Sequence, residues 1–196
     1  MVNIQHRLNH FIKVYDDVIS EDACSDIITY FNESKDKELS GVESGEVIDK
    51  IRHADELNVS VQHNPKAKKI HSFLVKACKR ILEWYKEDVG EYSEWVCDFK
   101  RVESFRIKHY DKGEGYYNTH IDNVGGREFA IIFYLNDVEK GGETEFPLLH
   151  TKIPPKAGRV LIFPTTYMYP HKANIPTSGD KLIIQGYILN ENKLNS

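Results

Sequence analysis

Several features are scarce in this 196-residue sequence, and each scarcity excludes a class of protein. There are only 3 cysteines, an odd number without Cys-x-x-Cys spacing, so we expect free thiols in a reducing compartment and no disulfide framework. No apolar run approaches the roughly 20 residues that cross a membrane, and residues 1–10 lack the apolar segment of a secretory signal. We therefore expect a cytoplasmic protein without a membrane partner.

Charge of a single sign is also lacking. The chain has 26 Lys and Arg against 30 Asp and Glu, a net charge of −4, and no long run of one sign. No nucleic-acid partner is expected from such a balance, although a local basic patch at residues 66–69 stays open. The length and the hydrophobic fraction of 40% suit one globular domain with a substantial core.

The N-terminal part of the chain predicts two helices that begin at caps. A short strand is expected at residues 11–15, and Ser20 then forms an N-cap before apolar side chains at i, i+3, i+4 and i+7 from Cys24. Asn64, followed by proline, begins a second amphipathic helix that runs to about Lys86. One face of each helix is therefore expected to be buried.

A long polar stretch separates these helices. We expect residues 33–50 to form an exposed loop, because they are polar and contain glycines. The larger stretch of residues 33–62, with Arg52 and His53, is interpreted as a lid over a site, since long loops are often functional.

The rest of the chain predicts short β-strands separated by glycine and proline turns, an arrangement typical of a sandwich or barrel. The expected strands are residues 105–110, 116–122, 129–135, 143–146, 160–163 and 182–188. The fold class is therefore α+β, mainly β, with an antiparallel double sheet and N-terminal helices packed outside it. We expect one domain over residues 1–196, with a helical part at about 1–90 and a β core at about 95–190.

A candidate metal site centres on His120 and Asp122. On a strand, residues two apart point to the same face, so an imidazole and a carboxylate would converge. Two histidines and one carboxylate hold non-haem Fe(II) and leave open positions. His171 is the best third ligand, while Glu143 and Glu145 stay open as alternative carboxylates. His109 and His150 are interpreted as structural or exposed histidines.

Three further side chains are candidates for an anion pocket beside this metal site. Lys181 begins the last strand, where a buried ammonium can pair with the carboxylate of an anionic cosubstrate. The hydroxyls of Tyr110 and Tyr134 are expected to help hold the same carboxylate. Each also has a non-functional interpretation: Lys181 as a solvent-exposed cation at a strand end, and the two tyrosines as ordinary core residues.

Taken together, these motifs resemble the prolyl 4-hydroxylase-like branch of the Fe(II)/2-oxoglutarate-dependent dioxygenases, over residues 12–189. The resemblance is carried by segments that occur in the family's order and spacing: residues 12–24, 110–122, 134–147 and 158–164, then His171 and Lys181. It implies a double-stranded β-helix, which is a form of jelly roll. It also implies Fe(II) bound by His120, Asp122 and His171, and 2-oxoglutarate bound by Lys181 with help from Tyr110 and Tyr134.

The resemblance implies an enzyme that uses O2 to hydroxylate an unactivated C–H bond and releases succinate and CO2, with ascorbate as a cofactor only by analogy. A prolyl residue of a peptide or protein is the expected substrate, and a free amino acid or small metabolite is the alternative. Arg127, Asn118 and Tyr169 are candidate substrate residues, although Arg127 is also well explained as a surface cation.

Three other functions compete with this interpretation. A hydrolytic zinc enzyme would have no use for Lys181, and a non-catalytic jelly-roll binding module would be expected to lack a ligand. The nucleic-acid demethylase branch of the same superfamily typically anchors the cosubstrate with arginine, whereas this chain has Lys181.

Overall fold

The computed structural model describes residues 8–40, 42–43, 46–47 and 51–190. Its longer helices are α2 (Glu21–Glu33) and α3 (Pro65–Val89), with short 3-10 helices at Val59–Val61, Gly90–Trp95 and Pro147–Leu149. The first strands are β1 (Lys13–Tyr15), β2 (Glu38–Ser40), β3 (Val42–Glu43), β4 (Glu46–Val47), β5 (Arg52–Asn58), β6 (Arg101–Val102) and β7 (Arg106–Tyr110). They are followed by β8 (Tyr116–His120), β9 (Arg127–Tyr134), β10 (Thr144–Phe146), β11 (Thr151–Ile153), β12 (Val160–Pro164), β13 (His171–Ala173) and β14 (Lys181–Leu189).

Both helices begin at the caps that the sequence predicts. The Ser20 hydroxyl accepts the Ala23 amide hydrogen at 3.3 Å, and the Asn64 side-chain oxygen accepts that of Ala67 at 2.8 Å. Helix α3 runs slightly past the predicted end and stops at Gly90, whose φ of +61° suits glycine. Within the described part of the chain, neither helix has the combination of length and apolarity that a membrane span requires.

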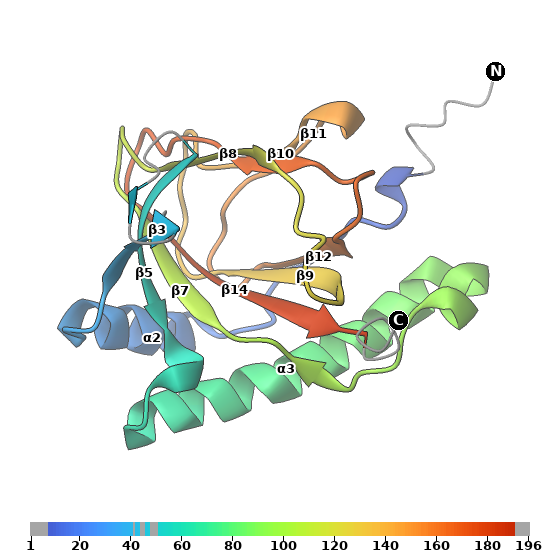
Figure 1. Ribbon diagram of the computed structural model, residues 1–196, viewed down its shortest axis with the longest axis horizontal. Coiled ribbons are helices and arrows are strands. Elements are labelled where there is room, and N and C mark those ends of the chain that lie inside the picture. The colour runs from blue at the N-terminus through green and yellow to red at the C-terminus, as the bar shows by residue number, and fades with distance from the viewer. Residues whose placement is uncertain (1–7, 41, 44–45, 48–50, 191–196) are drawn as a thin grey trace.

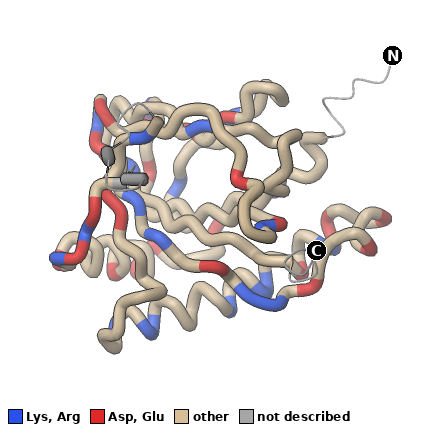
Figure 2. The backbone as a smooth tube through the Cα atoms, in the orientation of Figure 1, with Lys and Arg blue, Asp and Glu red and all other residues tan. Residues whose placement is uncertain are grey.

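The strands form a curled antiparallel sheet in the order β1-β12-β9-β14-β7-β5-β8-β13-β10-β11. Figure 1 shows α2 and α3 along one side of the layer that contains β5, β7, β14 and β9, with β8, β10 and β11 on the opposite side. This is the jelly-roll-like, mainly β arrangement with outer helices that the sequence predicts. Figure 2 shows cationic and acidic residues interspersed along the described chain, as its charge balance suggests.

Strand β5 corrects the lid interpretation for residues 52–58. It pairs with β7 on one side, and on the other with β8 and with β2, so this stretch supplies ordered strands of the sheet. The exposed loop expected at residues 33–50 likewise contains β2, β3 and β4, and its residues 41, 44–45 and 48–50 lie outside the described residues. Arg52 and His53 are therefore strand residues that pair with β8.

Strand β9 shows how the core is divided into two parts. Its alternate residues Phe129, Ile131 and Phe133 face α2 and α3, whereas Ala130 and Ile132 face the interior of the curled sheet. A strand covered on both faces must be apolar at every position, which is the pattern that predicted it. The interior layer of this core surrounds the candidate site.

Leu74 offers a test of the packing between α3 and the sheet. Its side chain is 0% exposed, whereas its neighbour Phe73 is 40% exposed on the same helix. We expect Leu74→Ala to lower the free energy of unfolding by about 2–5 kcal/mol and Phe73→Ala by less than about 1 kcal/mol, because only the first leaves a buried cavity. Equilibrium unfolding in urea would measure both, and equal losses would show that this face of α3 is not the one packed on the core.

Candidate functional site

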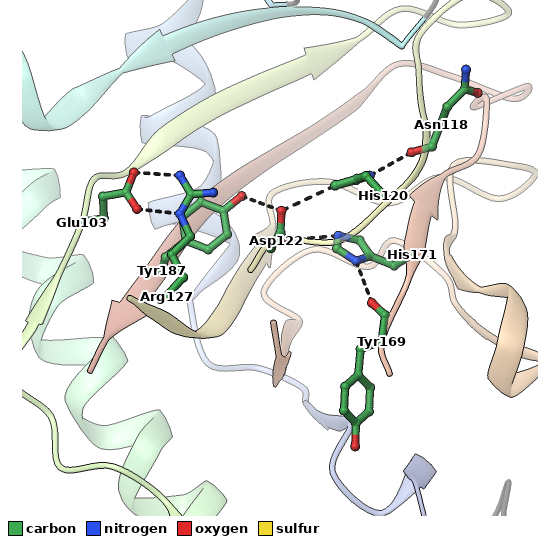
Figure 3. A network of polar contacts seen from close by, with 8 residues as sticks. All are labelled: Glu103, Asn118, His120, Asp122, Arg127, Tyr169, His171 and Tyr187. Atoms are coloured by element: carbon green, nitrogen blue, oxygen red, sulfur yellow. Dashed lines mark hydrogen bonds and ion pairs between the residues drawn. The ribbon is translucent and has the colours of Figure 1, made fainter. Parts of the chain in front are cut away.

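The metal candidates come together at the junction of β8 and β13. His120 ends β8, His171 begins β13, and the two residues are direct partners in the antiparallel pairing of these strands. Asp122 lies just beyond β8, so the prediction that it shares a strand with His120 is wrong. Its carboxylate nevertheless turns back toward both imidazoles, as Figure 3 shows.

The ligand atoms of these three residues lie within 4.8 Å of one another, a spacing that fits a single metal ion. The Nε2 atom of His120 is 3.5 Å from Oδ1 of Asp122, and Nε2 of His171 is 3.3 Å from Oδ2. Asp122 and His171 are buried and His120 is half-buried. The structure therefore assembles the set of two histidines and one carboxylate that the sequence predicts.

Backbone carbonyls determine which ring nitrogens face the ligand position. The Nδ1 atoms of His120 and His171 lie 2.8 Å and 3.2 Å from the carbonyl oxygens of Asn118 and Tyr169, and must donate to them. Each Nε2 then carries a lone pair that points at Asp122. Among the described residues, Nε2 of His120 and Oδ2 of Asp122 are buried without a hydrogen-bond partner. Lone pairs that converge in this way fit a bound cation.

Tyr187 and Arg127 support the carboxylate from the opposite side. The Tyr187 hydroxyl donates to Oδ1 of Asp122 at 3.1 Å, and the Arg127 guanidinium lies 3.7 Å from the centre of the Tyr187 ring. Arg127 also donates two hydrogen bonds to Glu103, at 2.6 and 2.7 Å. The hydrogen bond from Tyr187 favours the ionised form of this carboxylate. An ionised carboxylate is the form that binds metal.

Lys181 lies where the sequence predicts an anion anchor. Its side chain is 1% exposed, and its ammonium has no hydrogen-bond partner among the described residues. It lines a small pocket together with both histidines of the triad and Tyr110. Burial lowers the pKa of Lys181 to about 7. A buried ammonium without a counter-ion, beside a metal site, fits a carboxylate of a bound dicarboxylic acid.

The two predicted tyrosines differ in their contacts. The rings of Tyr110 and Tyr134 lie 5.0 and 5.9 Å from the Lys181 ammonium. The Tyr134 hydroxyl donates to the Thr144 hydroxyl at 2.7 Å, and Thr144 lines the pocket in its place. Tyr110 therefore reaches the pocket directly, whereas Tyr134 acts on it through Thr144, a residue that the sequence did not single out.

The remaining predicted residues lie around this centre. Asn118 and Tyr169 contact the triad through their carbonyl groups, and the Tyr169 hydroxyl donates to the Leu8 carbonyl, so the Tyr169 side chain points away from the metal ligands (Figure 3). Glu143 and Glu145 do not join the triad; both accept from the Asn174 amide.

Two histidines lie outside the triad. His150 is exposed, as expected, and sits in the left-handed conformation with φ of +47°. His109 groups with Asp111 and Asp180 at the surface, in a second arrangement of possible ligands.

A wider cleft of about 530 Å³ opens on the other side of Asp122. Four cations line it: Arg52, Arg106, Lys108 and Arg127. Arg106 and Lys108 are residues that the sequence reasoning missed. The alternation of β7 could have found them, because residues two apart share a face and Tyr110 was already placed in the pocket.

The residues that form this site lie in a part of the chain that is similar to a known protein family. The model of the 2OG-Fe(II) oxygenase superfamily matches residues 105–189, which hold the triad and Lys181. This part of the chain, less than half of its length, is similar to that superfamily. Two curated relatives come from Arabidopsis thaliana: probable prolyl 4-hydroxylase 3 is 31% identical over 39% of this chain and 29% of its own length, and probable prolyl 4-hydroxylase 7 is 42% identical over 24% and 17%. The chain thus spans less than a third of the curated relatives that it matches.

Solved structures of the 2OG-Fe(II) oxygenase superfamily share the fold. A viral collagen prolyl hydroxylase from Paramecium Bursaria Chlorella virus-1 is 22% identical with a TM-score of 0.69, covering 91% of this chain and 95% of its own. A Pseudomonas putida prolyl-4-hydroxylase is 16% identical with a TM-score of 0.67, covering 96% and 100%. These solved structures show that the chain shares their fold, and the two curated relatives that it resembles over part of its length are also probable prolyl 4-hydroxylases.

Proposed function

We propose that this protein is an Fe(II)- and 2-oxoglutarate-dependent hydroxylase of a prolyl residue in a peptide or protein, formed as one domain by residues 1–196. The observation that carries the proposal is the buried, unpartnered ammonium of Lys181 in the same pocket as His120 and His171. A zinc hydrolase has no bound dicarboxylate to pair with this ammonium. Its burial would then destabilise the folded protein without any compensating contact.

Each residue of the site has a distinct role in the proposed reaction. His120, Asp122 and His171 would hold Fe(II), and Lys181 would pair with the distal carboxylate of 2-oxoglutarate. When bound, the metal and the 2-oxo acid supply the oxidative chemistry, in which O2 converts 2-oxoglutarate to succinate and CO2 and one oxygen atom enters a substrate C–H bond. Tyr187 orients the carboxylate of Asp122 through its hydroxyl.

The protein contributes positioning and the exclusion of water. The carbonyls of Asn118 and Tyr169 hold the two imidazoles in the tautomer that presents Nε2. The Tyr117 ring stacks on His120 with a centroid separation of 3.5 Å and covers one side of it. Arg127, held by Glu103 at the edge of the wide cleft, is placed to contact a substrate that enters there.

A prolyl substrate is supported by the names of the relatives and neighbours, which are prolyl hydroxylases. Free amino acids and small metabolites are the alternative substrates, and a cleft of about 530 Å³ accommodates either kind. Ascorbate is proposed as a cofactor only by the same likeness.

Anaerobic addition of Fe(II) and 2-oxoglutarate should produce a visible charge-transfer band. Zn(II) in place of Fe(II) is the matched control and should give no band. With O2, succinate release should rise when a proline-rich peptide is added, and mass spectrometry should find the hydroxylated product. No band with the unaltered protein would overturn the proposal, whereas a band with free amino acids as the productive substrates would overturn only its prolyl part.

A further inference from the structure

Two of the four cations that line the wide cleft beside Asp122 are paired with acids. Arg106 donates to Glu56 at 2.5 Å, and Arg127 pairs with Glu103 through two hydrogen bonds. Lys108 and Arg52 differ from these two. Among the residues that the structure describes, no carboxylate lies within 4 Å of either cationic group.

Lys108 is the more informative of the two. Its side chain is 4% exposed, yet it lines the cleft, because β7 turns Arg106, Lys108 and Tyr110 toward the same interior face. Placing an ammonium there is unfavourable unless an anion accompanies it. The centre of the Tyr117 ring lies 5.5 Å from the ammonium, and Glu56, the cross-strand partner of Lys108 on β5, is paired with Arg106.

This lysine belongs to a different compartment from Lys181. Lys181 lines the small pocket that contains both histidines, whereas Lys108 lines only the wide cleft that contains Asp122. Tyr117 and Gln185 border both compartments. The triad is therefore flanked by one buried ammonium on each side, and 2-oxoglutarate accounts for only one of them.

We propose that Lys108, with Arg52, binds a carboxylate of the substrate close to the carbon that is hydroxylated. This inference rests on the proposed function and adds the chemical class of the substrate. Arg52 lies 5.5 Å from the centre of the same Tyr117 ring, so two cations, one from β5 and one from β7, approach one aromatic ring. Because Tyr117 stacks directly on His120, the carboxylate would lie within about three residues of extended chain from the reacting carbon.

A carboxylate can come from an acidic side chain or from a chain terminus, and four peptides separate the two sources. The probes, all with acetylated N-termini, are Ala-Glu-Pro-Gly-Ala amide, Ala-Pro-Glu-Gly-Ala amide, the neutral Ala-Gln-Pro-Gly-Ala amide, and Ala-Gln-Pro with a free C-terminus. We expect at least one anionic peptide to exceed the neutral peptide by about tenfold or more in kcat/KM, measured by succinate release at pH 7, since a charge-assisted contact is worth that much. Thermal shift of the Fe(II) and 2-oxoglutarate complex measures binding of the same peptides without turnover.

Lys108→Met is the decisive variant, because methionine keeps most of the volume and removes the charge. We expect the preference for the anionic peptide to fall to about one while the visible Fe(II) and 2-oxoglutarate band stays unchanged, which also shows that the variant is folded. Lys112→Met, at an exposed position of the β7–β8 turn, should keep the preference.

An equal response to neutral and anionic peptides, a preference that survives Lys108→Met, or no response to any peptide while the band forms would each overturn the carboxylate assignment and leave the 2-oxoglutarate chemistry in place. Absence of the band in the unaltered protein would overturn both proposals.

Discussion

Replacing His171 by alanine is expected to lower both Fe(II) affinity and turnover by more than about 100-fold. Loss of a residue that only orients a metal ligand costs about 10–100-fold, and His171 supplies a ligand atom itself, with Nε2 3.3 Å from Asp122. Anaerobic Fe(II) titration in the presence of 2-oxoglutarate, followed through the visible band, measures the affinity. Succinate release measures the turnover.

The matched control is His109→Ala, which removes a histidine from the other group with metal-binding spacing. His109 lies with Asp111 and Asp180 near the surface, so this variant should keep the band and the activity. Because His171 is buried against the rings of Phe146 and Phe163, circular dichroism must show that both variants are folded. A band that disappears in His109→Ala and persists in His171→Ala would show that iron binds at the His109 group and not at the triad.

Lys181→Met is expected to have two large and opposite effects. Without 2-oxoglutarate, the free energy of unfolding should rise by about 4 kcal/mol at neutral pH, because burial that lowers the pKa of this lysine to about 7 also destabilises the folded state. The affinity for 2-oxoglutarate should fall by about 100-fold, since a buried carboxylate would lose its charged partner. Urea unfolding and titration of the visible band measure the two quantities.

The pH dependence of the same variant has a definite sign. The pKa of Lys181 is about 7 in the folded protein and near 10.5 when unfolded, so between these values the unfolded chain binds more protons. The contribution of Lys181 to stability therefore rises as the pH increases from about 7 to 10.5, and Lys181→Met should lack that rise. Unchanged 2-oxoglutarate affinity would show that Lys181 is not the anchor, and a loss of stability would show that its role is structural.

The helices, and the grouping of the candidate metal ligands, could be predicted from the sequence because their signals are local or chemically distinctive. Ser20 and Asn64 are caps that act on amides three residues away, so no distant partner is needed to recognise them. His120, Asp122, His171 and Lys181 were singled out through residue types and order, and this holds even though Asp122, which the predicted strand 116–122 includes, lies beyond the end of β8.

The sequence failed where the structure depends on pairing between distant segments. Strand β5 is mostly polar because its interior face borders the cleft, so its composition resembles a loop until β7 and β8 pair with it. Tyr187 and Lys108 were missed for a related reason. Alternation along a strand predicts which side chains share a face. It does not predict which of the two faces lines the active-site cleft.

Lys181 and Tyr187 stand on the same strand and on the same face of it. Strand β14 is hydrogen-bonded to β7 on one side and to β9 on the other, and each of its residues is buried. Sliding this strand by a single residue would turn both side chains outward at once. The position of Lys181 beside 2-oxoglutarate and that of Tyr187 beside Asp122 therefore depend on the same strand register. A mutation can change one of these contacts without the other only by replacing that side chain, because a shift of the strand would move both.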